Sequence, residues 1–226
     1  YPECIIPCPC LQQSNAKGEI DLTEAEANLG ISLKLAELLR ARGYTVVLSR
    51  EDEGKDEGPP EDTNGDGRFT NRDGLQRIVD EANESKAELF ISVHNNAAPA
   101  KSARGTEIYY CASRPFADKS KRLARLALAH IREELKKVGY ESLNRGVKDD
   151  TTLYRNRGHL FLLGPARDAS SWRRIVHPRE TQMPGILGET LFVSNDTEAA
   201  LLRRDDIRAA IARGYANAVD EYFQEA

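Results

Sequence analysis

Hydrophobic positions along the chain alternate between helical and strand-like spacing. Apolar residues recur every three or four positions in segments that predict helices over 23–43, 73–85, 115–138 and 205–223. Short apolar runs between these segments predict strands over 44–50, 87–94, 105–111, 159–163 and 185–193. Strands that alternate with helices are typical of an α/β fold. We therefore expect one α/β domain over residues 1–226, with a mostly parallel central sheet and helices on both faces.

Composition narrows the class of protein. Of the 226 residues, 40% are hydrophobic and 30% are charged, as in globular proteins with a buried core. The net charge is −4, so there is no basic excess to attract nucleic acid. The longest apolar runs have the length of strands and cannot cross a bilayer. We expect no nucleic-acid partner and no membrane span, and composition leaves the oligomeric state open.

Three side chains stand where chemistry is usual in an α/β domain. His94 ends a buried strand and is followed by Asn95 and Asn96, Glu24 lies in the first turn of a helix, and Glu189 is an acid within an apolar strand. Each has an ordinary explanation. The helix dipole alone favours a first-turn Glu, and a strand-end His is often structural. Glu189 is harder to explain, because a buried carboxylate needs a partner.

Four segments together resemble one enzyme family. They are "TEAEANLGISLKLAELLRARGYTVVLSR", "QRIVDEANESKAELFISVHNNA", "RGTEIYY" and "MPGILGETLFVSN". In this order they resemble the zinc-dependent N-acetylmuramoyl-L-alanine amidases, which cleave bacterial peptidoglycan. The resemblance runs from about residue 19 to the carboxyl terminus. Leu191 stands where the family more usually has Gly before Phe192, a mild departure.

The resemblance implies a role for each residue. Glu24 and His94 map onto zinc ligands, Glu189 maps onto the catalytic acid, and Asn96 and Arg77 lie beside them as supporting residues. Zinc would activate water, and Glu189 would take the proton of that water and pass it to the leaving amine. The alternative for Glu189 is a structural salt bridge, to Arg50 or Arg77. The implied substrate is the amide bond between N-acetylmuramic acid and L-alanine.

The family's remaining ligand, a His in a Gly-rich turn, has no counterpart before His94. The segment "IIPCPC" falls in its place, so Cys10, or Cys8 if the turn is shifted, is a candidate thiolate ligand. Three alternatives stay open: a disulfide, exposed free thiols, and an amino-terminal segment that is not the native one. If there is a disulfide, Cys4 with Cys111 is a better pair than Cys8 with Cys10, which lie too close along an extended segment.

A second motif has the spacing of an EF-hand-type calcium loop, "DTNGDGRFTNRD". The expected ligands are Asp62, Asn64, Asp66, the carbonyl of Arg68, and Asp73. Asp at the last position, instead of Glu, resembles the dockerin variant. The alternative is an acidic, turn-rich surface loop. We expect an insertion over about 51–73 in which calcium has a structural role.

The polar stretch at about 165–182 is a second insertion, which forms either a lid over the groove or a surface loop. Three interpretations of function remain: an active zinc amidase, an inactive relative that binds peptidoglycan or regulates another hydrolase, and a zinc peptidase that acts on other amides. Since peptidoglycan lies outside the cytoplasm, the resemblance implies an extracytoplasmic protein. No signal peptide is recognisable in these residues.

Overall fold

The computed structural model describes residues 12–14, 20–52, 61–68, 70–152, 158–167 and 177–224. Its elements in chain order are β1 (Gln12–Ser14), β2 (Ile20–Thr23), α1 (Glu24–Ala41), α2 (Asn71–Glu84), β3 (Phe90–Asn96), β4 (Thr106–Tyr110), α3 (Ala117–Lys137), β5 (Asn144–Asp149), the short 3₁₀ helix η2 (Asp150–Thr152), β6 (Gly185–Phe192), α4 (Asp196–Leu202) and α5 (Asp205–Gln224). No described helix is long and apolar enough to cross a membrane.

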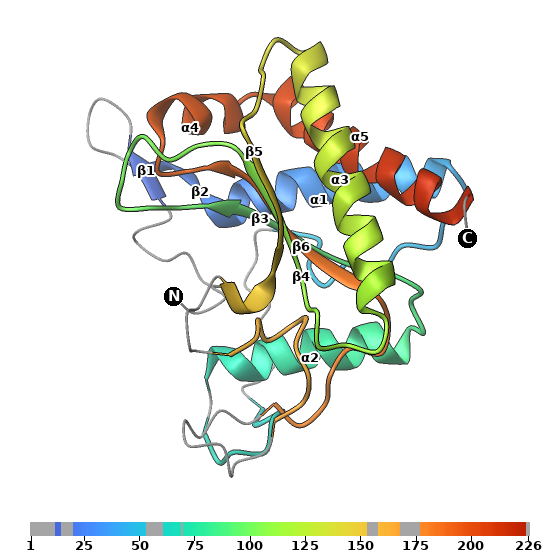
Figure 1. The fold of residues 1–226 in the computed structure, drawn as a ribbon. Coiled ribbons are helices and arrows are strands. Elements are labelled where there is room, and N and C mark those ends of the chain that lie inside the picture. The colour runs from blue at the N-terminus through green and yellow to red at the C-terminus, as the bar shows by residue number, and fades with distance from the viewer. Residues whose placement is uncertain are drawn as a thin grey trace.

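The central sheet has four strands in the order β3-β6-β4-β5 (Figure 1). β3 pairs with β6 and β4 pairs with β5 in parallel, whereas β4 and β6 are antiparallel. Two of the three pairings are therefore parallel, which confirms the expected α/β class with a mostly parallel sheet. A separate antiparallel pair, β1 and β2, leads into α1.

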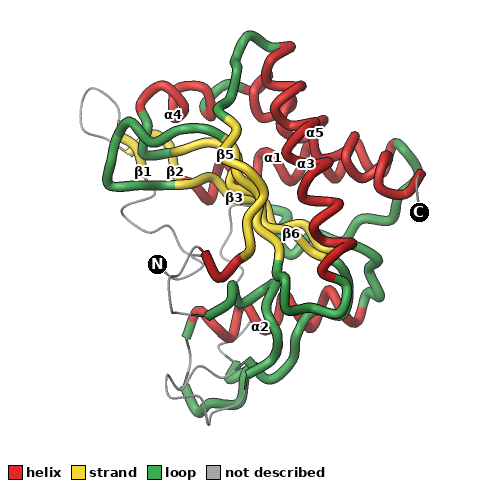
Figure 2. Tube along the Cα trace, in the orientation of Figure 1, coloured by secondary structure: helices red, strands yellow, loops and turns green. Residues whose placement is uncertain are grey.

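The two faces of the sheet are covered differently. Helices α1, α3 and α5 cover one face, where Ile108 and Ile186 join the main apolar core. We call the other the site face. Near Tyr109 and Leu187 it is covered by the buried turn at 160–163, whose Phe161 and Leu162 also pack against α2. In Figure 2, loops surround α2 while the strands occupy the centre of the molecule.

The expected strand at 159–163 is wrong, because these residues form a turn in which Gly164 N and Leu163 N both donate to Leu160 O. Four of the five are buried leucine or phenylalanine residues. An apolar run of this length indicates burial but does not distinguish a strand from another buried segment. The strand that follows α3 and pairs with β4 is instead β5, which the hydrophobic periodicity did not predict.

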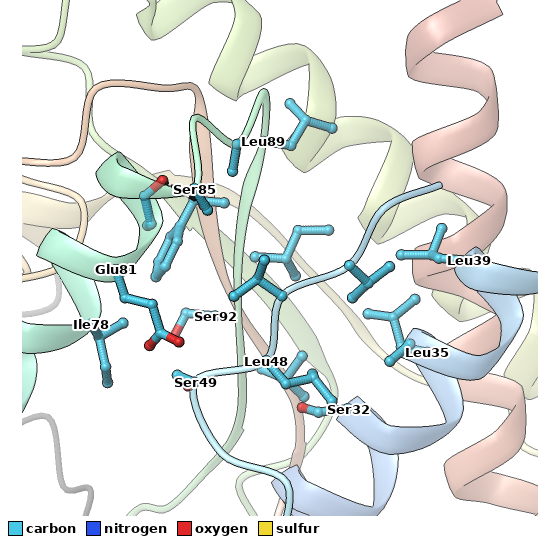
Figure 3. Close-up of a pocket in the computed structure, with 18 of the residues that line it drawn as sticks. Ser32, Leu35, Leu39, Leu48, Ser49, Ile78, Glu81, Ser85, Leu89 and Ser92 are labelled. Atoms are coloured by element: carbon cyan, nitrogen blue, oxygen red, sulfur yellow. Dashed lines mark hydrogen bonds between the residues drawn. The ribbon is translucent and has the colours of Figure 1, made fainter. Parts of the chain in front are cut away.

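The expected strand at 44–50 is also wrong. This segment follows α1 but enters no ladder among the described residues. A cavity of about 640 Å³ separates it from β3, with α1 and α2 forming the other walls (Figure 3). Hydrogen bonds from Arg40 to Val46 O and from Arg50 to Ala25 O attach the segment to α1 instead.

Helix α5 crosses α3 at a glycine. A Cβ added at Gly214 would lie 2.5 Å from the Cα of Ile131, so the backbones could not keep their present spacing. Gly30 in α1 serves as a control for Gly214, since it is also a glycine inside a helix. A Cβ added at Gly30 would meet the flexible side chain of Arg208, at 3.1 Å, and no backbone atom as closely.

We predict that Gly214→Ala lowers the free energy of unfolding by about 1–3 kcal/mol through overpacking. Gly30→Ala should leave it unchanged or raise it by up to about 1 kcal/mol, since Ala favours the helix. Urea denaturation followed by circular dichroism measures both. Equal stability of the two variants would contradict the close crossing of α3 and α5.

Candidate active site

A row of three polar side chains crosses the site face. His94 on β3 and Glu107 on β4 both lie opposite Glu189 on the central strand β6. Partners in register on neighbouring strands project to the same face of a sheet. The sheet thus places His94, Glu189 and Glu107 side by side, although they are far apart in sequence.

Glu24 joins this row from the start of α1. Thr23 caps the helix in a capping box with Glu26, and this fixes Glu24 as the first helical residue. The Glu24 side chain is buried, and its Oε1 lies 2.8 Å from His94 Nδ1. The structure therefore brings together the two residues that the sequence predicts as zinc ligands.

A chain of hydrogen bonds orients Glu24. Its Oε1 accepts from Asn28 Nδ2 at 3.1 Å and from Asn95 N at 3.3 Å. Asn95 Nδ2 donates to Asn28 Oδ1, and Thr190 Oγ1 donates to Asn95 Oδ1. Partners of this kind orient metal ligands in proteins. Asn28 and Asn95 therefore hold the Glu24 carboxylate in place, and both lie within the two segments that contain Glu24 and His94, although no sequence pattern assigned them a role.

Glu189 is the single partly exposed position of β6, yet its Oε2 is buried with no hydrogen-bond partner among the described residues. The charged groups that act on Glu189 in the described part of the chain are His94, Glu24 and Glu107, and neither Arg50 nor Arg77, the salt-bridge partners that the sequence left open, is among them. Desolvation raises the pKa of Glu189 well above its ordinary value; His94 opposes this rise, and Glu24 and Glu107 add to it. A carboxylate that accepts a proton readily suits an acid–base role.

Glu107 has the opposite electrostatic setting. Burial opposes its ionisation, but hydrogen bonds from Lys148 and Arg145 outweigh burial and hold the pKa of Glu107 below its ordinary value. Its Oε1 accepts from Asn96 Nδ2 at 2.7 Å and from Tyr109 at 2.9 Å. Glu107 is therefore a fixed anion beside Glu189. The sequence analysis missed it, although an acid in an apolar strand is the signal that revealed Glu189.

A groove of about 610 Å³ leads away from this row along β4 and β5. Its lining combines apolar side chains with the polar ones of Asn96, Glu107, Arg145, Lys148 and Thr152. The groove provides hydrogen-bond donors, acceptors and both signs of charge next to Glu189. Such a surface fits a substrate with amide and hydroxyl groups better than an apolar one.

The remaining predicted site residues lie apart from the row or outside the described part of the chain. Arg77 lies on α2 and is partly buried. Cys8 and Cys10 are outside the described residues, so their ligation stays a prediction. Cys111 is a buried free thiol, and the interpretation of a Cys4–Cys111 disulfide is therefore wrong.

The predicted calcium loop is closed by its own side chains. Asp62 accepts from Asp66 N and Gly67 N, Asn64 Oδ1 accepts from Asp66 N, and Asp66 Oδ1 accepts from Arg68 N. Both oxygens of Asp73 accept backbone N–H groups, those of Asn64 and Thr70. In the described chain, these carboxylates do not form a group of three whose ligand atoms lie within 4.8 Å of one another. Asp73 also completes the capping box of α2 with Thr70.

Both described ends of the 165–182 insertion are held by polar contacts. Arg167 and His177 form a backbone bridge. Glu180 pairs with Arg114, and Arg179 pairs with Asp80 on α2. Burial lowers the pKa of His177 to about 4, so this histidine is neutral where it stacks on Phe161. A lid over the groove and a surface loop both stay predictions for this stretch.

The donors in this row fit a zinc ion. His94 supplies an imidazole nitrogen and Glu24 a carboxylate oxygen, both common zinc ligands. Their separation of 2.8 Å is short enough for both to contact one ion. Beside them lies the buried Oε2 of Glu189, which has no hydrogen-bond partner among the described residues.

Comparisons with known proteins agree with this geometry. A family model described as Amidase_3, N-acetylmuramoyl-L-alanine amidase, matches residues 11–221. The germination-specific N-acetylmuramoyl-L-alanine amidase of Bacillus subtilis is 26% identical over 204 residues, which cover 90% of this chain and 72% of that protein.

Solved structures show the same likeness. The CwlD amidase of Clostridioides difficile, solved in complex with the GerS lipoprotein, superposes with a TM-score of 0.68 at 25% identity and covers 99% of this chain and 94% of its own. The catalytic domain of CwlV from Bacillus (Paenibacillus) polymyxa has a TM-score of 0.61 at 25% identity. This match covers 89% of this chain and 86% of the CwlV chain. The chain therefore belongs to the N-acetylmuramoyl-L-alanine amidase family and is a hydrolase of this type.

Proposed function

We propose that this protein uses zinc to hydrolyse the amide bond between the lactyl group of N-acetylmuramic acid and L-alanine in peptidoglycan. The observation that carries the proposal is the contact of Glu24 with His94 beside the buried Glu189 oxygen, which has no hydrogen-bond partner in the part of the chain that the structure describes. The family match over most of the chain supports the same bond specificity.

Glu24 and His94 would hold the metal, with Asn28 and Asn95 keeping the Glu24 carboxylate in place. A zinc ion held there would supply Lewis acidity for the scissile carbonyl and for water. Glu189 accepts the proton of the attacking water and delivers it to the departing nitrogen of L-alanine. The C–N bond breaks, leaving a lactyl carboxylate and a free amine.

The groove along β4 and β5 would hold the substrate next to Glu189. Lys148 and Arg145 offer positive charge there, and Glu107 keeps these cations in place. Since peptidoglycan lies outside the cytoplasm, the proposal places the protein in the cell envelope or outside the cell.

Glu189→Gln should abolish hydrolysis, with a loss of at least about 100-fold, because the amide cannot accept the proton. Zinc content should stay unchanged, since Glu189 is not proposed as a ligand. Release of dye from labelled peptidoglycan, with and without chelator, measures the activity. Soluble stem peptides that begin with L-alanine identify the bond.

The inactive alternative is settled by the same assay. A zinc-loaded wild-type protein that binds peptidoglycan but releases nothing would be a binding or regulatory relative. Full activity of Glu189→Gln would remove Glu189 from the mechanism. Release of peptides that do not begin with L-alanine would favour a peptidase.

We propose Cys10 as the third protein ligand, with Cys8 as the alternative. Its support is the position in the sequence and the affinity of thiolate for zinc. Cys10→Ala should lower the zinc content of the amidase site, and Cys8→Ala should not. Zinc per chain, measured after dialysis, tests both variants. Unchanged content in both would exclude cysteine from this site.

We also propose a structural calcium ion in the loop from Asp62 to Asp73. Its support is the motif spacing and the inward turn of Asp62, Asn64 and Asp66. Calcium should raise the melting temperature, because an ion that binds only the folded state stabilises it. Asp66→Ala should remove that gain, which differential scanning calorimetry measures. A wild-type melting temperature unaffected by calcium would contradict the proposal.

A further inference from the structure

A second cluster of metal-ligating side chains lies away from the row of Glu24, His94 and Glu189. Cys111 Sγ lies 3.3 Å from His159 Nδ1, which lies 2.8 Å from Asp150 Oδ1. Among the described residues, this is the one group of three His, Cys, Asp or Glu whose ligand atoms all lie within 4.8 Å of one another. We propose that Cys111, Asp150 and His159 form a second, structural site for zinc.

The sheet itself brings the cluster together. β4 and β5 are parallel neighbours, with Tyr110 opposite Asp149. The residues that follow this pair, Cys111 and Asp150, therefore emerge at the same edge. His159 reaches them from the start of the buried turn, where Leu160 N donates to Asp150 Oδ2 at 3.1 Å. Two strand ends and one turn thus supply one donor each.

The geometry fits a common ion better than a catalytic relay. In a Cys–His–Asp relay the thiol and the carboxylate contact opposite nitrogens of the ring. Here both contact the same nitrogen, Nδ1 of His159. A single N–H at Nδ1 would have to be shared between the two acceptors, whereas one cation can attract all three donor atoms.

The donor set selects the class of metal. A thiolate, an imidazole and a carboxylate are ligands of zinc, while magnesium and calcium prefer oxygen alone. Donors around a tetrahedral zinc ion lie about 3.3–3.7 Å apart. The observed separations of 3.3 and 2.8 Å approach this range, so small side-chain shifts are enough to accommodate the ion.

Burial gives the site a structural rather than a catalytic setting. Cys111 is 2% exposed, Asp150 is fully buried, and the His159 side chain is 16% exposed. His159 leads into Leu160 and Leu163, which pack on Tyr109 and Leu187 of the site face. An ion here would tie this turn to the ends of β4 and β5.

The test separates this site from the amidase site. In a background with Glu24→Gln and His94→Gln, we expect one zinc per chain after dialysis, held under reducing conditions. Adding Cys111→Ser should remove it. His159→Gln should also remove this zinc ion. If Cys111→Ser does not fold, the zinc content of His159→Gln decides the test. His130→Gln is the matched control, because this half-buried histidine on α3 also contacts a carboxylate, that of Glu221.

Cobalt gives a second readout that does not depend on activity. Cobalt added to the background protein should produce a sulfur-to-metal charge-transfer absorption. The absorption should vanish with Cys111→Ser and persist when Cys4, Cys8 and Cys10 are all replaced by Ser. A zinc-free background protein would overturn the proposal, as would zinc content that is equal in His159→Gln and His130→Gln.

Discussion

The contact between Glu24 and His94 is the constraint on which the site depends. It joins the first turn of α1 to the carboxyl end of β3, two elements that the sheet does not connect. A buried carboxylate needs compensation, and Glu24 receives it from His94, Asn28 and the backbone of Asn95. The capping box at Thr23 fixes where the helix begins and hence where this carboxylate lies. The contact therefore fixes the start of α1 relative to the carboxyl end of β3.

The three carboxylates near His94 differ because their surroundings differ. Glu24 is held by hydrogen-bond donors, and Glu107 is held as an anion by Lys148 and Arg145. Glu189 has a buried oxygen with no hydrogen-bond partner among the described residues, and its pKa is raised, whereas the pKa of Glu107 is lowered. Fixed charges on either side make it costly to ionise Glu189 as well, which favours proton uptake there. In the proposed mechanism these three similar side chains therefore take different roles: Glu24 as metal ligand, Glu107 as fixed anion and Glu189 as base.

Sequence reasoning found those candidate site residues whose signal is local, and the structure brings them together. A strand-end His, a first-turn Glu and an acid in an apolar strand identified His94, Glu24 and Glu189. Glu107 carries the same signal as Glu189, but its cationic partners lie on β5, a strand with no apolar periodicity to reveal it. The run at 159–163 indicates burial but not a turn, and the segment at 44–50 has strand composition but no ladder. Pairing is a property of the fold, so composition alone could not settle either segment.

The mixed sheet also explains why two clusters of donors occur in one small domain. Parallel strands place their carboxyl ends at one edge, where polar side chains gather. Here β3 and β6 end at one edge while β4 and β5, which run the other way, end at the opposite one. The first edge carries His94 and Glu189, and the second carries Cys111 and Asp150. The antiparallel pairing of β4 with β6 therefore gives the molecule two such edges, and the buried turn at 160–163 links the second edge to the face that carries the first.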